Sequence, residues 1–209
     1  MALNLVHRVR VPHAAGAEPL PAVVLVHGWL GNEKVMSVFE RLLPPGVITI
    51  SPRAPVPMRP DSYGWFVGLD NDAGVADGLA KLRAFVEALP AAYPVDPARV
   101  TLVGFSQGGA MSAALALAVP TLVRAVGVLA GFVPVQAQGW ATPGKLEGKP
   151  VFIAHGTDDD TVAIDKARAA QTTLSAAGAL VEYHEYPVGH KLNTAGMNDL
   201  KAWLAENAA

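Results

Sequence analysis

A chain of 209 residues with 51% hydrophobic and only 16% charged residues indicates a well-filled globular interior and argues against a disordered protein. The formal net charge of −2 shows no basic excess to attract phosphate backbones, so we expect no nucleic-acid partner. Because the chain contains no cysteine, disulfide bonds, a thiolate nucleophile and cysteine-based metal sites are also excluded.

Two segments bear on whether the protein enters a membrane. Arg8 and Arg10 interrupt the N-terminal stretch where a secretory signal needs an unbroken apolar core, so we expect a cytoplasmic protein. Residues 100–123 carry no charge, but Gly104 and Pro120 break this run well short of a membrane-spanning helix. We therefore expect no membrane span.

The predicted strands are short apolar runs rich in Val, without the alternation of a sheet that faces water on one side. In chain order they occupy residues 22–27, 47–51, 99–105, 124–130 and 151–155, followed by a more polar edge strand at 180–186. Residues 5–11 are predicted to add an outer strand.

Segments with helical spacing of apolar residues lie between these strands. They cover residues 33–43, 73–89, 107–119, 165–177 and 193–206. This alternation predicts an α/β protein with a mainly parallel sheet, helices on both faces and ligands at the carboxyl ends of the strands. No linker divides the chain, so we expect one domain over residues 1–209. Residues 131–149 are too few for a large lid domain.

The segment Gly104-Phe105-Ser106-Gln107-Gly108 matches the pattern G-x-S-x-G. An apolar strand precedes it and an Ala-rich helix follows, as a nucleophile elbow requires. In such a turn the serine has a strained backbone and an exposed hydroxyl, and the glycines let neighbouring chains pass closely. Ser106 is therefore the predicted nucleophile. A Gly-rich turn that binds an anion or merely packs is the alternative.

A serine hydroxyl needs a base to take its proton, and histidine has a suitable pKa near neutrality. His27 and His155 each end a predicted strand, whereas His190 lies on the loop between the last strand and the final helix. The chain order serine, acid, histidine places the base after the last strand. We therefore predict His190 as the base, with His27 and His155 as less favoured candidates.

The acid that orients the histidine should lie between Ser106 and His190 in the sequence. Three adjacent carboxylates, Asp158, Asp159 and Asp160, follow the strand predicted at 151–155. Such a run is also typical of a solvated turn and helix cap. Spacing alone does not choose among the three.

A tetrahedral intermediate needs two fixed hydrogen-bond donors for its oxyanion. The first predicted donor is the backbone N–H of Gln107, directly after the nucleophile. The second is expected from the loop His27-Gly28-Trp29-Leu30-Gly31, where we favour the N–H of Trp29 over that of Leu30.

A proline-rich loop at residues 51–66 ends in three aromatic residues, Tyr63, Trp65 and Phe66. Proline stiffens a loop, so these rings are predicted to bind substrate as an acyl-binding wall. Alternatively, the rings fill the core below the loop.

Several motifs together resemble the phospholipase/carboxylesterase group of α/β-hydrolases, which includes acyl-protein thioesterases and small bacterial esterases. The likeness covers nearly the whole chain, from Val24 to the final helix. It rests on LVHGWLGNE, on PRAP followed by YGWF, on VDPARVTLVGFSQGGAMS, and on HGTDDDTV followed by YPVGH. The resemblance implies an α/β-hydrolase fold.

The resemblance also implies site residues. It supports Ser106 and His190 as triad members, selects Asp159 as the acid, and supports the amides of Trp29 and Gln107 as the oxyanion hole. Trp29 is bulkier than the residue usual at that turn, which predicts a narrow acyl pocket.

These residues predict a serine carboxylesterase that cleaves small or short-to-medium acyl esters through an acyl-Ser106 intermediate. The expected partner is a small-molecule ester, and no cofactor or metal ion is expected. Because a triad does not record the leaving group, a thioesterase or amidase with the same residues is an alternative. A non-catalytic member of the fold that binds acyl ligands is another. The sequence makes no prediction of the oligomeric state.

Overall fold

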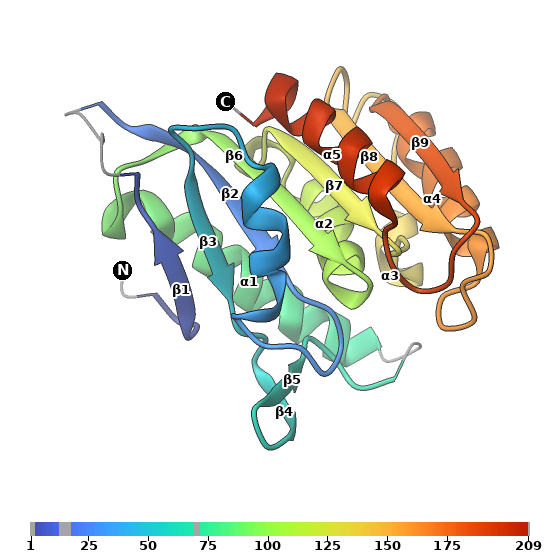
Figure 1. The fold of residues 1–209 in the computed structure, drawn as a ribbon, viewed down its shortest axis with the longest axis horizontal. Helices are drawn as coiled ribbons and strands as arrows, with labels where there is room; N and C mark the ends of the chain where they lie inside the picture. The colour runs from blue at the N-terminus through green and yellow to red at the C-terminus, as the bar shows by residue number, and fades with distance from the viewer. Residues whose placement is uncertain (1–2, 13–17, 69–71, 209) are drawn as a thin grey trace.

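A largely parallel sheet forms the centre of the molecule (Figure 1). The computed structural model describes residues 3–12, 18–68 and 72–208, and within them seven strands lie in the order β1-β3-β2-β6-β7-β8-β9. The strands are β1 (His7–Arg10), β2 (Leu20–Val26), β3 (Ile48–Pro52), β6 (Val95–Phe105), β7 (Ala125–Leu129), β8 (Pro150–Gly156) and β9 (Leu180–Tyr186).

Strand pairing follows the predicted pattern. β1 lies antiparallel to β3 at one edge, and the other neighbouring strands of this sheet pair in parallel. β2 shows why the central runs are continuously apolar: Val24 and Val26 pack on one side of the sheet, and Val23 and Leu25 on the other. The mainly parallel α/β sheet is thus confirmed, and β6 begins four residues before the predicted start.

Helices cover both faces of the sheet (Figure 1). On one face lie α1 (Asp72–Ala92), α2 (Gln107–Ala118) and α4 (Ile164–Ala176). The other face is covered by η1 (Val35–Leu42) and α5 (Thr194–Asn207). The short segments η2 (Pro120–Leu122) and α3 (Val135–Gln138) follow α2 and β7. No helix in the described ranges is long and apolar enough to cross a membrane.

The helix predicted at residues 33–43 is a 3-10 helix, η1, and this changes which side chains share a face. In a 3-10 helix, residues three apart lie above one another. Met36, Phe39 and Leu42 accordingly form one buried row, between 3% and 7% exposed. Val35 and Val38 belong to a second row and are each 48% exposed. η1 therefore presents a separate, partly exposed row to the surface.

The proline-rich loop contains an antiparallel hairpin that the sequence analysis did not predict. Its strands are β4 (Val56–Arg59) and β5 (Ser62–Gly64). A bridge between Gly31 and Tyr63 joins this hairpin to the loop that follows β2. Two strands outside the main sheet thus support one of the loops at its carboxyl edge.

Candidate active site

Ser106 stands at the turn between β6 and α2, in a backbone conformation that non-glycine residues rarely adopt. Its φ is 55° and its ψ is −119°. A Cβ atom at Gly104 would lie 2.2 Å from the carbonyl oxygen of Gly108, and one at Gly108 would lie 2.0 Å from that of Val26. Only glycine fits at these two positions, so close backbone packing holds the strained turn in place.

Hydrogen bonds anchor the same turn to its neighbours. The N–H of Ser106 donates to the carbonyl oxygen of Leu129 at the end of β7, at 2.8 Å. The carbonyl oxygen of Ser106 accepts from Ala110 at 3.1 Å and so begins α2. Ser106 is 9% exposed and lines a groove of about 1060 Å³. The predicted nucleophile is therefore fixed and open to a ligand.

Asp159 lies on the loop after β8 with its side chain fully buried. One carboxylate oxygen, Oδ1, accepts from the amides of Thr161 and Val162, both at 2.9 Å. The other, Oδ2, is 2.7 Å from Nδ1 of His190. Asp158 and Asp160 are exposed. Of the three adjacent carboxylates, Asp159 is the one in contact with His190.

Two opposing effects set the ionisation of Asp159. Burial favours the neutral acid, whereas hydrogen bonds from the amide of Val162, from His190 and from the amide of Thr161 favour the carboxylate. The donors prevail, and the pKa of Asp159 lies below its ordinary value. An ionised carboxylate can only accept, so the proton of the neutral imidazole resides on Nδ1. Nε2 of His190 is then left with a lone pair.

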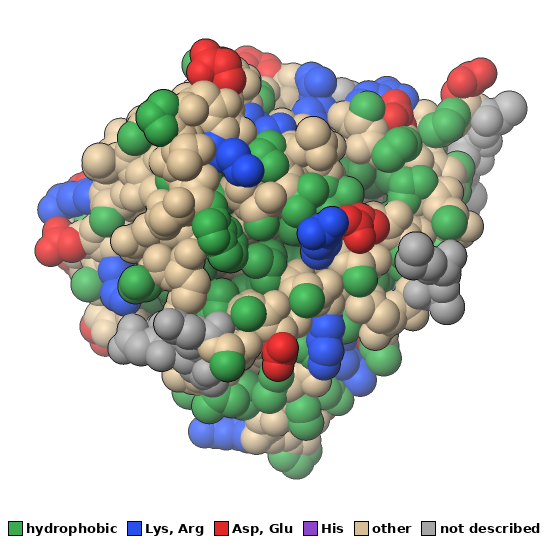
Figure 2. Space-filling view, turned by 180° about the vertical axis from the view of Figure 1, so that it is seen from behind, with side chains coloured by type: hydrophobic (Ala, Val, Ile, Leu, Met, Phe, Trp, Pro, Cys, Tyr) green, Lys and Arg blue, Asp and Glu red, His purple; other side chains and the backbone are tan. Residues whose placement is uncertain are grey.

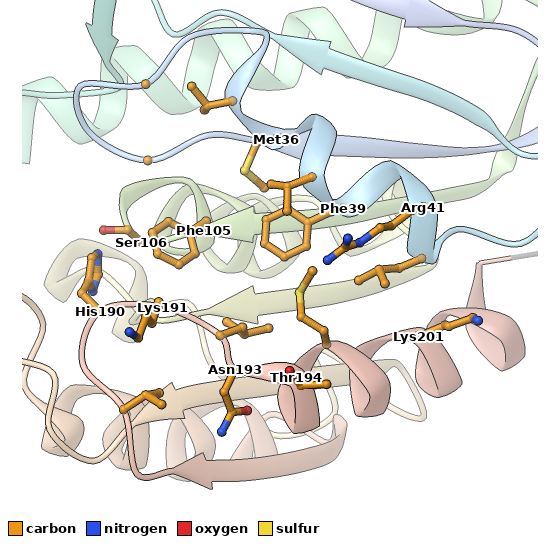
Figure 3. A pocket seen from close by; sticks show the side chains of 18 of the residues that line it. Met36, Phe39, Arg41, Phe105, Ser106, His190, Lys191, Asn193, Thr194 and Lys201 are labelled. Carbon is orange, nitrogen blue, oxygen red and sulfur yellow. The ribbon is translucent and has the colours of Figure 1, made fainter.

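His190 lies beside the elbow. Its ring centroid is 5.0 Å from that of Phe105, the residue before the predicted nucleophile. Ser106 and His190 line the same groove, and Figure 3 shows the hydroxyl of Ser106 facing the imidazole of His190. The structure thus brings together the serine, histidine and aspartate that the sequence singled out.

The less favoured histidines hold neighbouring loops instead. Nε2 of His155 lies 2.7 Å from the carbonyl oxygen of Val162 and 3.3 Å from Oδ2 of Asp159. His27 donates from Nδ1 to the carbonyl oxygen of Gly28 at 2.7 Å and accepts at Nε2 from the amide of Ala54. Burial lowers the pKa of His27, which favours this neutral form.

The loop after β2 packs directly against the nucleophile. A Cβ atom at Gly28 would lie 3.1 Å from the Cβ of Ser106. The amide of Gly31 donates to the carbonyl oxygen of Gly28 in a tight turn, with Leu30 at a φ of 61°. The Gly31 amide is already occupied by this hydrogen bond. The amides of Trp29 and Leu30, which the sequence analysis named, remain the candidates for the second oxyanion donor. Gln107 is the first residue of α2, and its amide has no acceptor within that helix.

The side chain of Gln107 has a second role that sequence reasoning missed. Its Oε1 accepts from the amide of Trp65 at 2.7 Å, and its Nε2 donates to the carbonyl oxygen of Phe66 at 2.8 Å. The indole N–H of Trp65 donates to the carbonyl oxygen of His27 at 2.9 Å. Gln107 and Trp65 thus tie the elbow to the loop after β2.

The predicted acyl-binding wall does not form at the groove. Trp65 and Phe66 are 0% and 1% exposed and belong to the core, because their backbones are held by Gln107. Tyr63 stacks on the guanidinium of Arg53, 4.5 Å from the ring centroid, and lines a separate, smaller pocket. For Trp65 and Phe66 the alternative prediction, in which the aromatic rings fill the core, is the correct one.

An ion pair fastens the segment after the Trp29 loop to the loop after β3. Arg53 donates from two nitrogens to the two carboxylate oxygens of Glu33, at 2.7 and 2.9 Å. The hydrogen bond from Arg53 holds the pKa of Glu33 at about 2, although burial acts in the opposite direction. This bidentate pair was not predicted, because its partners lie 20 residues apart in the sequence.

The groove has a volume of about 1060 Å³ and runs between η1 and α5. Its lining includes Met36, Phe39 and Phe105, and Trp29 stands at its rim with 57% of the residue exposed. Trp29 therefore does not close the groove, which corrects the expectation of a narrow acyl pocket. Among the described residues, no group of three or more His, Asp or Glu gathers as a metal site.

Residues 13–208 match the family model described as Phospholipase/Carboxylesterase. The chain belongs to the phospholipase/carboxylesterase family. A relative, carboxylesterase SOBER1 of Arabidopsis thaliana, is 28% identical over 136 residues, which are 64% of this chain and 59% of that protein. Acyl-protein thioesterase 1 of Mycosarcoma maydis is 28% identical over 91% of this chain and 92% of its own length.

Solved structures agree with this family. Esterase PE8 superposes with a TM-score of 0.83 at 26% identity, covering 97% of this chain and 99% of that one. A carboxylesterase of Bacillus cereus superposes with a TM-score of 0.86 at 21% identity, covering 97% and 94%. The fold is that of an α/β-hydrolase, as predicted. The chain spans only about half the length of several of the curated carboxylesterases that it matches, 59%, 44% and 51% of them.

Proposed function

We propose that this member of the phospholipase/carboxylesterase family is a serine carboxylesterase that hydrolyses small or short-to-medium acyl esters through an acyl-Ser106 intermediate. The observation that carries the proposal is the contact of 2.7 Å between Asp159 and His190, with His190 facing the hydroxyl of a strained Ser106. With its proton on Nδ1 and a lone pair on Nε2, the neutral imidazole of His190 has the form that general-base catalysis requires.

In the acylation step, Nε2 of His190 takes the proton of the Ser106 hydroxyl while Oγ attacks the acyl carbon of the ester. The electron pair of the carbonyl bond moves onto its oxygen. As this intermediate collapses, the bond from the acyl carbon to the alcohol oxygen breaks, and His190 returns the proton to that oxygen. Asp159 stabilises the imidazolium in between, because its carboxylate accepts from Nδ1 throughout.

In the deacylation step, a water molecule repeats the cycle on the acyl-enzyme. His190 takes a proton from the water, and the resulting hydroxide attacks the acyl carbon. The bond to Oγ of Ser106 then breaks, and His190 protonates Oγ. The products are a carboxylic acid, an alcohol and the free enzyme.

The oxyanion of each intermediate would be held by the amides of Trp29 and Gln107. The Gln107 amide lies at the N-terminus of α2, where free N–H groups and the helix dipole favour negative charge. The hydrogen bonds of Gln107 and Trp65 fix the second loop against the elbow. Donors that are already in place need no rearrangement when charge develops, and this is the main source of their effect.

Hydrolysis of p-nitrophenyl esters tests the proposal. The purified protein should release nitrophenol with a pre-steady-state burst if acyl-Ser106 accumulates, and Ser106→Ala should lower kcat by at least about 10⁴-fold. Ser37→Ala, which removes an exposed serine of η1, is the matched control and should keep full activity. Binding of acyl ligands without release of any product would favour the non-catalytic alternative.

A thioesterase that uses the same residues is the second candidate. The observation that favours it is the match to acyl-protein thioesterase 1 of Mycosarcoma maydis over 91% of this chain. Matched oxygen esters, thioesters and anilides of one acyl group separate the possibilities. The proposed carboxylesterase should show its highest kcat/KM on the oxygen ester, and a clear preference for the thioester or the anilide would replace it with a thioesterase or an amidase.

A further inference from the structure

The groove carries one sign of charge. Its charged lining residues are Arg41, Lys191 and Lys201, and neither Asp nor Glu lines it within the described residues. All three cationic residues are exposed, and none forms an ion pair with another described residue. This is unusual for a chain whose 18 acidic residues outnumber its 16 basic ones. The acidic neighbour of Arg41, Glu40, faces Arg10 instead.

The opposite face of the protein differs. Figure 2, which views the molecule from behind, shows acidic and basic side chains scattered among one another over that face. A surface of mixed sign creates little net field, whereas a hollow lined by cations concentrates positive potential and attracts anions. The charge of the groove is therefore a local feature of the η1 and α5 side.

The 3-10 geometry of η1 places Arg41 in this groove. Val35, Val38 and Arg41 follow one another at intervals of three residues, so they form a single row, and all three line the groove. In an α-helix the period of 3.6 residues would turn Arg41 away from Val35. Val35 and Val38 thus form an apolar part of the groove wall, and the guanidinium of Arg41 stands at its end.

The opposite wall has the same arrangement. Thr194, Met197 and Lys201 lie on one side of α5 at helical spacing, and all three line the groove. Figure 3 shows Ser106 and His190 at one end of the groove, and Arg41 and Lys201 towards the other. Both walls therefore place a cation at the end remote from the predicted nucleophile.

We propose that this groove binds esters that carry a negatively charged group, a carboxylate or a phosphate, on the chain that extends from the reacting carbonyl towards Arg41 and Lys201. The proposal rests on the proposed esterase function, because it assigns the substrate class of the same site. The planar guanidinium of Arg41 suits bidentate binding of either anion. Apolar residues such as Phe39 line the same groove and offer contact area to the chain of the substrate.

The two walls also set the length of the substrate. The six residue-to-residue steps from Val35 to Arg41 rise about 12 Å in a 3-10 helix, and the seven steps from Thr194 to Lys201 rise about 10 Å in an α-helix. An extended chain of roughly eight methylene groups covers this span. The anion that Arg41 and Lys201 would bind is therefore expected at the end of a medium-length chain, whereas Lys191 lies beside His190 at the reacting end (Figure 3).

Two series of substrates test the proposal. One series compares p-nitrophenyl monoesters of dicarboxylic acids with p-nitrophenyl alkanoates of equal length, over increasing chain length. The other compares p-nitrophenyl alkanoates whose chain ends in a phosphate with unsubstituted p-nitrophenyl alkanoates of equal length. In at least one series, kcat/KM should be about tenfold higher for the anionic member at medium length, and added salt should reduce the ratio. Equal values at every length in both series would overturn the proposal.

Variants test whether the named cations cause the preference. In Arg41→Gln with Lys201→Gln, the ratio of kcat/KM for anionic over neutral esters should fall towards one. Arg59→Gln, which removes an exposed arginine of β4 away from the groove, is the matched control and should keep the wild-type ratio. A ratio that survives in the double variant would overturn the assignment.

A binding measurement separates this inference from the proposed function. Calorimetric titration of Ser106→Ala with a medium-length dicarboxylate and with the matching monocarboxylate needs no turnover. Tighter binding of the dicarboxylate, lost in the Arg41→Gln and Lys201→Gln background, supports the anion site. Equal affinity for the two acids overturns that site even if wild-type protein is an esterase. Absence of hydrolysis for every ester overturns the proposed function instead.

Discussion

The reaction centre and the groove beside it are built in different ways. At the centre, backbone atoms approach so closely that Gly104 and Gly108 have no room for a Cβ, and Asp159 is buried among four hydrogen-bond donors or contacts. The groove is lined by side chains of η1 and α5, several of them half-exposed. Chemistry therefore depends on backbone geometry, whereas the range of substrates depends on which side chains line the walls.

The largest expected effect comes from the acid at the centre. Asp159→Asn should lower kcat by about 10³-fold to 10⁴-fold, because an amide in place of the carboxylate can stabilise the wrong imidazole tautomer and cannot support its cation. Steady-state kinetics on an activated ester measure this. Asp160→Asn, the exposed neighbour, is the matched control and should change kcat by less than about twofold. Similar losses in both variants would contradict the choice of Asp159.

A second substitution tests the close backbone packing. Gly108→Ala should destabilise the protein by at least about 3 kcal/mol, because the new Cβ would lie 2.0 Å from the carbonyl oxygen of Val26. Urea unfolding monitored by circular dichroism gives the free energy of unfolding. Gly139→Ala has no atom within 4 Å of its new Cβ and should be nearly neutral. Equal stability of the two variants would show that the elbow can relax.

The ion pair beside the centre should have a moderate effect on stability. Glu33→Gln should cost about 2 kcal/mol at neutral pH, since it removes the charge from a bidentate contact with Arg53. Glu40→Gln, whose partner Arg10 lies 3.8 Å away in a more exposed pair, is the control and should cost less than about 1 kcal/mol.

The same carboxylate predicts a pH dependence. Its pKa falls from 4.5 to about 2 on folding, so its contribution to stability is fully present above pH 4.5 and is lost as the pH falls towards 2. The stability difference between wild type and Glu33→Gln should shrink over that window. A difference that stays constant between pH 5 and pH 2 would contradict the role of Arg53 in holding Glu33 ionised.

The smallest effect is expected in the groove. Val38→Ala should raise KM for medium-chain esters about threefold and leave kcat and the kinetics of acetyl esters nearly unchanged, because it removes apolar contact area from the wall alone. Val135→Ala, which shortens an exposed side chain away from this groove, is the matched control. An equal change for acetyl and medium-chain esters would mean that Val38 acts on the centre and not on the chain.

The sequence predicted the sheet well because its central strands are buried on both faces. Runs such as Val23, Val24, Leu25 and Val26 then contain no polar residue that could mislead the interpretation. The elbow was predictable because only glycine fits at positions 104 and 108, and the sequence shows a glycine at both. Asp159 was chosen over its two neighbours by family resemblance, since burial of that one carboxylate depends on the loop conformation.

Other features carried no local signal. The hairpin of β4 and β5 lies in a proline-rich segment, where proline argues against strands that are not at an edge. The 3-10 geometry of η1 was hidden because Met36, Phe39 and Leu42 suit an α-helix almost as well. Burial of Trp65 follows from its contacts with Gln107 and His27, which are distant in the sequence.

The most direct test of the account is the site of modification by a fluorophosphonate, a probe that reacts with activated serine hydroxyls. Peptide mass spectrometry should find the adduct on Ser106 alone, with no adduct after Ser106→Ala and markedly slower labelling after Asp159→Asn. An adduct on a different serine, or labelling of wild-type protein no faster than of the Ser106→Ala variant, would contradict the claim that Ser106 is the activated nucleophile.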